Sequence, residues 1–283
     1  MNAIELSHIH KSLGGFAIQD LSLTVPSGTI CGLVGENGAG KSTTIRLMMN
    51  ALTPDSGTAR VLGVDAASPE FREVKEDVGV VLDEAYYPET LTAVQVGRVM
   101  AETYRRWEQK RYEDFLDRFQ LPGKKRFKDF SRGMKMKLSI AVALSHQPRL
   151  LVLDEATSGL DPIVRDEVLE IFNEFTREED HSILISSHIL SDLEKICDYI
   201  AFLHQGRLLF CDEKDQLLET YGLFAGTAEQ AESLRPEAVI GRESSGFGGI
   251  RALVRREEVP AGLELERASV EDIILFMVKG ARK

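Results

Sequence analysis

Residues 35–42 have the types and spacing of a phosphate-binding loop. Their sequence, Gly-Glu-Asn-Gly-Ala-Gly-Lys-Ser, matches the pattern G-x-x-x-x-G-K-[ST]. Glycines let the backbone curl until its N–H groups point at an anion, a lysine binds the β- and γ-phosphate oxygens, and a serine hydroxyl can ligate Mg²⁺. The residues expected to bind the nucleotide are Gly35, Glu36, Asn37, Gly38, Ala39, Gly40, Lys41, Ser42 and Thr43.

Two adjacent carboxylates, Asp154 and Glu155, follow the apolar run Leu150–Leu153. Asp154 is suited to hold Mg²⁺, usually through water, and Glu155 is suited to accept a proton from an attacking water. Because an acidic pair after a strand is also a common start signal for a helix, the pair alone decides little. Together with the glycine-rich loop it predicts a P-loop NTPase of unspecified kind, with Mg²⁺ as its metal cofactor.

A sheet must position these groups. Five apolar runs are typical of strands covered on both faces, as in a parallel sheet: Ile30–Val34, Val78–Leu82, Leu150–Leu153, Ser182–Ile185 and Tyr199–Leu203. The phosphate loop directly follows the first run and opens a helix expected over Ser42–Asn50, which is the context that the motif requires. Shorter strands with glycine and proline turns are expected earlier, at Ile4–His8, Leu21–Val25 and Thr58–Val61.

The segment after the second run is predicted to be helical. Apolar and aromatic side chains recur there at helical spacing: Val96, Val99, Met100, Tyr104, Trp107, Tyr112, Phe115, Leu116 and Phe119. We expect this stripe to pack in a core rather than to form an aromatic ligand site. A further helix is expected from about Met134 to Ser145.

The character of the sequence changes after residue 222. A loose glycine-rich stretch is expected at Gly241–Gly249, a strand at Ile250–Arg255, and a final helix whose start is signalled by Ser269 and Asp272. Three parts are therefore expected: a main α/β domain over residues 1–222, its helical subdomain at about 84–145, and a small α+β accessory domain over 223–283.

Composition limits the function classes. The chain has 283 residues and a formal net charge of −11, which disfavours binding to nucleic acid. No window approaches the roughly 18 apolar residues of a membrane span, and the N-terminus carries no secretory signal. Three cysteines without metal-ligand spacing suggest reduced thiols. We expect a soluble cytoplasmic protein.

Three further motifs indicate the family. Residues 130–134, Phe-Ser-Arg-Gly-Met, resemble the Leu-Ser-Gly-Gly-Gln signature of ABC ATPases, in the Ser-Lys/Arg-Gly-Met form common among ABC-2 type exporters. Residues 158–161 resemble the D-loop of that family, and Ser186-Ser187-His188 resembles its switch-histidine segment. The resemblance covers residues 2–222 in the family's motif order. It adds the signature residues Ser131, Arg132, Gly133 and Met134 and the D-loop residues Ser158, Gly159, Leu160 and Asp161.

The resemblance implies an ABC ATPase core, with a mostly parallel sheet, an N-terminal antiparallel β subdomain and a helical subdomain. It implies that the signature acts in trans, so that two subunits, a homodimer or a heterodimer with a paralogue, close around ATP and open on hydrolysis. Glu155, His188 and Lys41 would be the catalytic residues. A separately encoded membrane-spanning permease would be the partner, which would place the chain at the inner face of the cell membrane.

The chain departs from the family pattern at two positions. Leu13 occupies the place of the aromatic residue that stacks on adenine, and either Phe16 substitutes for it or Leu13 gives only an apolar contact. Asp83, followed by Glu84, replaces the glutamine that ligates Mg²⁺ and links to the permease. The expected metal ligands are therefore Ser42, Asp154 and Asp83. An aspartate can ligate Mg²⁺ but cannot donate a hydrogen bond as an amide does.

Further motif details resemble a Gram-positive exporter branch that handles antimicrobial or cytolytic peptides, including the phenol-soluble-modulin exporters, so peptides or drug-like amphiphiles are the expected cargo. The alternatives are a soluble ABC ATPase acting on ribosomes or DNA, and a binding module without catalysis. The accessory domain has two interpretations as well, because its final helix could close a small core or brace a dimer partner.

Overall fold

The computed structural model describes residues 1–84, 86–245, 249–260 and 262–281, and the chain divides into two compact units, Met1–Cys211 and Asp212–Lys283. The boundary between the units, after Cys211, lies earlier in the chain than residue 222, the end that the sequence predicts for the main domain. The second unit therefore includes helix α8 (Lys214–Thr220), which the sequence assigns to the first. No helix among the described residues is long and apolar enough to cross a bilayer.

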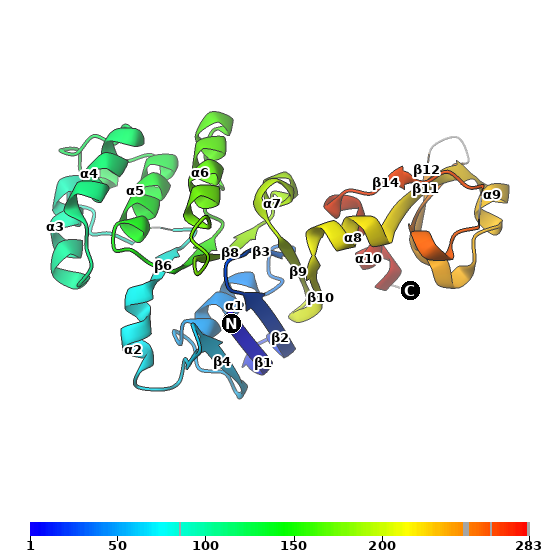
Figure 1. Cartoon of the computed structure of the whole chain (residues 1–283), viewed down its shortest axis with the longest axis horizontal. Coiled ribbons are helices and arrows are strands. Elements are labelled where there is room, and N and C mark those ends of the chain that lie inside the picture. The colour runs from blue at the N-terminus through cyan, green and yellow to red at the C-terminus, as the bar shows by residue number, and fades with distance from the viewer. Residues whose placement is uncertain (85, 246–248, 261, 282–283) are drawn as a thin grey trace. The chain divides into compact units, whose positions relative to one another are not determined.

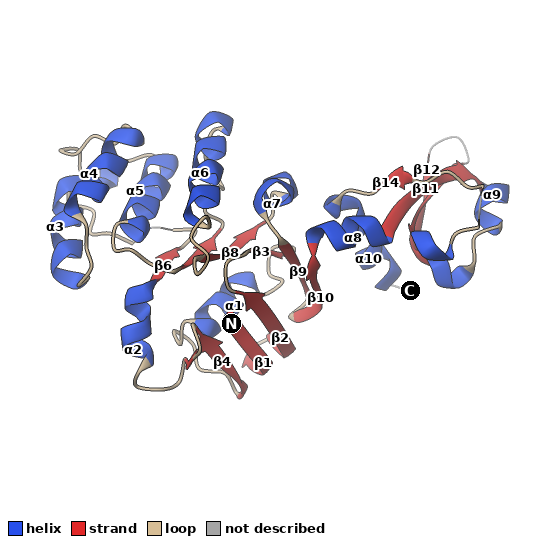
Figure 2. Ribbon diagram, viewed as in Figure 1, coloured by secondary structure: helices blue, strands red, loops and turns tan. Residues whose placement is uncertain are grey.

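A six-stranded sheet forms the centre of the first unit, with strand order β10-β9-β3-β8-β7-β6 (Figure 2). Its strands are β3 (Ile30–Val34), β6 (Val78–Val81), β7 (Leu150–Asp154), β8 (Ser182–Ser187), β9 (Tyr199–His204) and β10 (Arg207–Glu213). The pairs β6–β7, β7–β8, β8–β3 and β3–β9 are parallel, as the apolar runs predict. The carboxyl ends of β3, β6, β7 and β8 therefore share one edge of the sheet.

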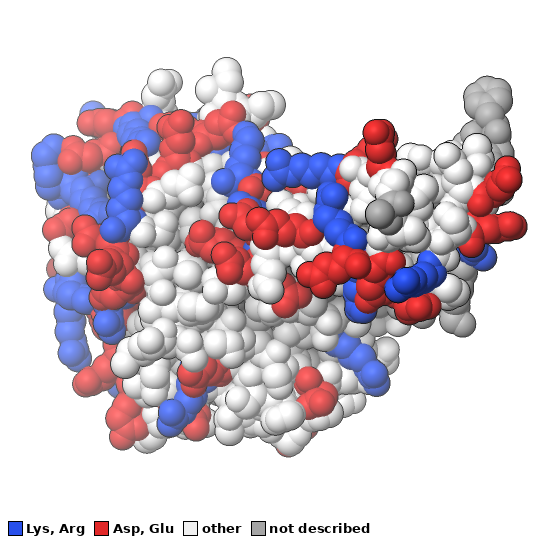
Figure 3. Space-filling view, turned by 45° about the vertical axis from the view of Figure 1, so that its right-hand side comes forward, with Lys and Arg blue, Asp and Glu red and all other residues white. Residues whose placement is uncertain are grey.

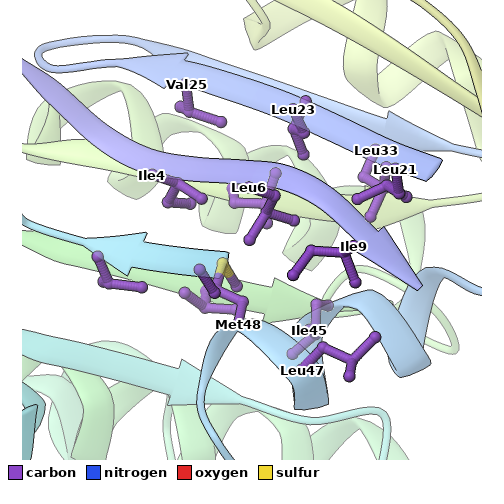
Figure 4. Packing of buried hydrophobic residues seen from close by; sticks show 14 of the residues in the cluster. Ile4, Leu6, Ile9, Leu21, Leu23, Val25, Leu33, Ile45, Leu47 and Met48 are labelled. Carbon is purple, nitrogen blue, oxygen red and sulfur yellow. The ribbon is translucent and has the colours of Figure 1, made fainter. Parts of the chain in front are cut away.

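An antiparallel sheet formed by the first sixty-five residues has the order β2-β1-β4-β5. Its strands are β1 (Asn2–Leu13), β2 (Phe16–Pro26), β4 (Ser56–Val61) and β5 (Val64–Asp65). Its inner face packs on helix α1 (Lys41–Met48) and on the six-stranded sheet through one apolar cluster (Figure 4). Ile9 of β1, Leu21 of β2 and Leu33 of β3 are fully buried in it. This core holds the phosphate loop between two sheets.

The helical segment follows β6, as predicted, and consists of α3 (Ala93–Thr103), α4 (Gln109–Arg118) and α5 (Arg132–Leu144) (Figure 1). The aromatic stripe is interrupted, because α3 ends at Thr103 and leaves Tyr104 and Trp107 in the connection to α4. Tyr112 is fully buried and its hydroxyl donates to the Ala93 carbonyl at 2.7 Å, so this part of the stripe packs in a core as expected, whereas Val99 is 47% exposed. The remaining helices of the unit are α2 (Phe71–Val74), α6 (Pro162–Phe175) and α7 (Leu190–Ile196).

The second unit is an α+β fold around a sheet of order β12-β13-β11-β14, all paired antiparallel. Its elements besides α8 are β11 (Tyr221–Thr227), α9 (Ala228–Glu232), β12 (Val239–Ser245), β13 (Gly249–Arg255), β14 (Glu266–Arg267) and α10 (Val270–Ala281). Ser269 caps α10 as predicted, since its hydroxyl accepts from the Asp272 amide at 3.1 Å.

The glycine-rich stretch of this unit differs from the prediction. Residues 241–245 belong to β12 and pair with β13, so they are not a loose loop. Residues 246–248 of the predicted stretch lie outside the described residues. Phe276 of α10 is fully buried and packs against Gly241, where a side chain would meet the Phe276 carbonyl oxygen at 2.3 Å. The apolar face of α10 thus closes a core within this unit.

Candidate functional site

The phosphate loop has the local geometry of an anion site. β3 ends at Val34 and α1 begins at Lys41, with Gly40 as the N-cap residue in the left-handed conformation, φ 113°. A glycine has no side chain to accept from the first amides of α1, so these amides are left for an anion. A Cβ on Gly40 would lie 2.9 Å from the tip of the Phe16 ring, so only glycine fits.

An open recess of about 400 Å³ lies over this loop, and we call it the phosphate-loop recess. The residues that line it are Phe16, Glu36, Asn37, Gly38, Gly40, Lys41, Ser42, Thr43, Asp83 and Glu155. Most of the predicted nucleotide and metal residues are thus brought together. The predicted residues outside this lining are Leu13, Gly35, Ala39, Asp154, His188 and those of the signature and D-loop.

Lys41 is buried, with only 7% of its side chain exposed. Its ammonium donates to the Gly35 carbonyl at 2.7 Å and lies 3.4 Å from the Glu36 carbonyl oxygen. Its closest carboxylate is Glu155, with Nζ 3.6 Å from Oε1. The loop therefore holds the ammonium at the recess with its charge matched by Glu155.

Glu155 links the recess to the switch histidine. Its second oxygen, Oε2, lies 2.6 Å from Nδ1 of His188, whose side chain is 53% exposed. The Glu155 backbone is left-handed, with φ 54°, and its N–H donates to the Ser186 carbonyl at 3.0 Å. A non-glycine residue in this conformation costs about 1–2 kcal/mol, and such strain gathers at functional sites. The turn directs the carboxylate toward Lys41 and His188.

Asp154 lies behind Glu155 and is buried, with 5% exposed. Its Oδ1 accepts from the Ser186 hydroxyl at 2.6 Å, a contact made possible by the parallel pairing of β7 and β8. The same hydroxyl oxygen lies 3.2 Å from the Glu155 amide. Ser186 therefore orients the Asp154 carboxylate and holds the backbone at Glu155, a role that its place two residues before His188 could have suggested and that we did not predict.

Asp83 follows β6 and reaches the recess from the side of the helical segment. Its Oδ1 accepts from the guanidinium of Arg132 at 2.6 Å. A second recess, of about 480 Å³, also includes Asp83 and is lined besides by Glu84, Arg132, Lys135 and Met136. Asp83 thus contributes to both recesses, and the partner of its carboxylate is a residue of the signature.

The signature and the D-loop lie beside each other. Ser131 is the N-cap of α5 and accepts from the Met134 amide at 3.3 Å. A Cβ on Gly133 would lie 3.6 Å from the Gly159 carbonyl oxygen and from the Leu160 side chain. In this chain Ser131 is a helix cap outside the phosphate-loop recess, and Asp161 caps α6 in the same way, accepting from the Val164 amide at 3.2 Å.

The structure distinguishes the two residues that the sequence offers for contact with adenine. Leu13 and Phe16 pair across the tight turn between β1 and β2. Phe16 lines the phosphate-loop recess and packs on Gly40, whereas Leu13 is 39% exposed outside the lining. Of the two residues that the sequence left open for the adenine position, only Phe16 lines the recess.

An ion pair that the sequence did not reveal, Arg165 with Asp192, lies next to the D-loop. Asp192 of α7 is 3% exposed, and its Oδ2 lies 3.8 Å from Nε of Arg165 on α6. A second guanidinium nitrogen of Arg165 donates to the Leu160 carbonyl at 3.3 Å. This pair connects the D-loop to the helix after His188, and nothing in the local sequence signals it.

The comparisons with known proteins agree with this geometry. A family model described as ABC transporter matches residues 18–158. The ABC transporter ATP-binding protein YtrB of Bacillus subtilis is 32% identical over 219 residues, which are 77% of this chain and 74% of that protein. The bacitracin transport ATP-binding protein BcrA of Enterococcus faecalis is 34% identical over 209 residues, covering 73% of this chain and 68% of BcrA.

Among solved structures, an ATP-binding subunit of an ABC transporter matches with a TM-score of 0.70 and 28% identity. The match covers 76% of this chain and 91% of that one. Together with the relatives it confirms the predicted fold class, an ABC ATPase core with mixed sheets and a helical segment. The chain therefore belongs to the ABC transporter family, as one of its ATP-binding ATPases.

Proposed function

We propose that the phosphate-loop recess binds MgATP and hydrolyses it. The observation that supports this most directly is the contact series from Lys41 through Glu155 to His188, with separations of 3.6 and 2.6 Å. Lys41 binds the β- and γ-phosphates, and Glu155 accepts a proton from the attacking water. His188 keeps Glu155 in place and contacts the γ-phosphate, while Phe16 stacks on the base.

The residues at the recess suit Mg²⁺. Ser42 and Asp83 line the recess and offer oxygen ligands, which Mg²⁺ prefers. Asp154 lies behind the lining, is oriented by Ser186, and offers a further carboxylate. In the described part of the chain, His, Cys, Asp and Glu side chains do not gather in threes that could hold a metal by themselves. This fits a cation held by one or two carboxylates, water and the nucleotide phosphates. When bound, Mg²⁺ supplies charge neutralisation for the phosphoryl oxygens.

We further propose that two subunits share each nucleotide. Ser131 and the amides at the start of α5 lie outside the phosphate-loop recess of their own chain, although a helix N-terminus favours an anion. A partner subunit related by a two-fold axis would bring its α5 to this nucleotide and receive the same contact in return. ATP favours this closed dimer because the closed form alone adds the contact to the γ-phosphate.

The energy of hydrolysis would power export through a separate permease, with peptides or drug-like amphiphiles as cargo. The likeness to BcrA, a bacitracin transport ATP-binding protein, supports this. The chain would then work on the cytoplasmic face of the membrane through that partner. The test is to look for a neighbouring gene that encodes about six apolar spans and to express its product together with the chain. The two should co-purify in detergent, and the cargo should raise ATP hydrolysis.

A soluble role on ribosomes or DNA is the alternative, and charge argues against it. On the face shown in Figure 3, basic and acidic side chains of the described residues are interspersed rather than gathered into a basic surface. The net charge of −11 also repels a phosphate backbone. Co-sedimentation with ribosomes, combined with failure to bind any membrane protein, would favour the alternative and contradict the proposed export function.

A further inference from the structure

Two charged residues that occupy positions where the general ABC motifs have neutral residues contact each other in the fold. Asp83 occupies the position of a neutral glutamine, and Arg132 occupies the position of the first glycine in Leu-Ser-Gly-Gly-Gln. Forty-nine residues separate them in sequence, yet the Arg132 guanidinium donates to the Asp83 carboxylate at 2.6 Å. One residue introduces a negative charge and the other a positive charge, so the pair is neutral as a unit.

The surroundings of Arg132 hold it against its own chain. Gly159 has a left-handed backbone, φ 76°, and a Cβ there would lie 3.2 Å from Cδ of Arg132. The guanidinium also lies 3.5 Å from the Ser158 hydroxyl. The arginine therefore crosses the D-loop to reach Asp83. Although it belongs to a motif expected to act on the partner's nucleotide, its charged end is engaged at the site in cis.

Stability does not account for this pair. The side chains of Arg132 and Asp83 are 59% and 47% exposed, and exposed ion pairs contribute little to folding. The position of Asp83 is more informative, because it lines the phosphate-loop recess together with Glu36 and Glu155. An uncompensated carboxylate there would repel the phosphates of a nucleotide. A neutral glutamine creates no such problem, whereas an aspartate needs a cation beside it.

We propose that Arg132 is a positioning residue that acts in cis. It holds Asp83 at the rim of the phosphate-loop recess and compensates the negative charge of its carboxylate, so that a nucleoside triphosphate can bind. This inference rests on the proposed nucleotide-binding function of the recess and goes beyond it. The signature arginine thus serves its own site through Asp83, while the neighbouring Ser131 is left for the partner's nucleotide. Asp83 and Arg132 form one functional unit, because the carboxylate at position 83 requires the arginine beside it.

The test is a double-mutant cycle on the full chain, made of Arg132→Gln, Asp83→Asn and the double variant. The measured quantity is the Kd of a fluorescent ATP analogue, in EDTA and at low salt, without hydrolysis. Arg132→Gln should weaken ATP-analogue binding about fivefold, which corresponds to the upper end of the energies measured for exposed ion pairs. The double variant should bind within about twofold of wild type, because the repelling carboxylate is gone. With Mg²⁺ or at about 0.5 M salt, the Arg132→Gln defect should shrink.

Conservative and distant variants provide the controls. Arg132→Lys keeps a cation near Asp83 and should restore most of the affinity. Arg118→Gln removes a comparably exposed arginine, which pairs with Glu167 at 3.3 Å away from the recess, and should leave the Kd unchanged. Circular dichroism on each variant confirms that the fold persists, as expected for exposed side chains.

Two results would overturn the inference. The first is that Arg132→Gln raises the Kd by the same factor in the wild-type background and in the Asp83→Asn background. This would show that Arg132 acts without Asp83. Unchanged affinity in Arg132→Gln, while wild type binds well, would show that the carboxylate needs no neutralisation. Wild-type affinity no better than that of Lys41→Ala would overturn the proposed nucleotide binding as well, so the two failures are distinguishable.

Discussion

The Glu155 carboxylate lies 2.6 Å from the His188 imidazole, Oε2 to Nδ1, although 33 residues separate them in sequence. The contact forms because β7 and β8 are neighbouring parallel strands, so the residues after them meet at one edge of the sheet. Glu155 also faces Lys41, which provides a cation for the carboxylate and for a phosphate. The proposed base is thus positioned from both sides before a nucleotide arrives.

Glu155→Gln should abolish most ATP hydrolysis while preserving nucleotide binding. An amide keeps the shape and the contact with His188 but cannot accept the proton of the attacking water, a loss of about 10²–10⁴-fold in rate. The variant should accumulate as an ATP-dependent dimer in light scattering. Glu167→Gln, which alters a half-buried carboxylate paired with Arg118, is the matched control. Wild-type phosphate release by Glu155→Gln would remove Glu155 from its proposed role.

Lys41→Ala should weaken ATP binding by about 10–100-fold, because a charge-assisted hydrogen bond to the phosphates is lost. The remaining Glu155 carboxylate then adds repulsion, since its nearest ammonium is gone. Equilibrium titration with a fluorescent nucleotide measures the effect. Lys195→Ala is the control, because that lysine pairs with Asp166 on the surface. Equal affinity in the Lys41 and Lys195 variants would contradict the assignment of the phosphate site.

Phe16→Ala and Leu13→Ala form a matched pair for the adenine position. Stacking of one base on an aromatic ring contributes about 1–3 kcal/mol, so Phe16→Ala should weaken ATP binding by about 5–150-fold. Leu13→Ala should have little effect, since Leu13 lies outside the recess lining. Competition between ATP and inorganic triphosphate separates base from phosphate binding. A larger effect at Leu13 than at Phe16 would reverse the assignment.

The stability of the first unit should fall as the pH is lowered, and His146 should cause part of this. Burial lowers the pKa of His146 to about 4 from an ordinary value of 6.5. Between these values the unfolded chain binds a proton that the folded chain does not, so stability decreases as the pH falls from 6.5 toward 4. From pH 7 to pH 5 the loss is about 2 kcal/mol.

His146→Phe tests this effect and keeps the aromatic stack on Tyr104, whose ring centroid lies 4.0 Å from that of His146. The variant should lose less stability than wild type between pH 7 and pH 5. Urea unfolding followed by the fluorescence of Trp107, the only tryptophan, provides the measurement. If the stability of both proteins had the same pH dependence, the pKa of His146 would not be lowered by burial in the folded chain.

Local chemistry explains why much of the site was predictable. The phosphate loop is a contiguous pattern in which backbone geometry requires glycine, as at Gly40, where a Cβ would lie 2.9 Å from the Phe16 ring. The central strands are apolar throughout because both of their faces are covered. Each feature depends on neighbours within a few residues, so the sequence alone determined the fold class and the catalytic candidates.

Tertiary structure decided the relationships among these segments. Three of these relationships join residues that are distant in sequence or lie on different strands. They are the position of Phe16, but not Leu13, at the recess, the hydrogen bond from Ser186 to Asp154, and the ion pair of Asp83 with Arg132. Such contacts depend on strand order, register and the packing of α5 beside β6, which many sequences with the same motifs could arrange differently. The sequence by itself determined which groups are present, and only the folded chain determined which of them touch.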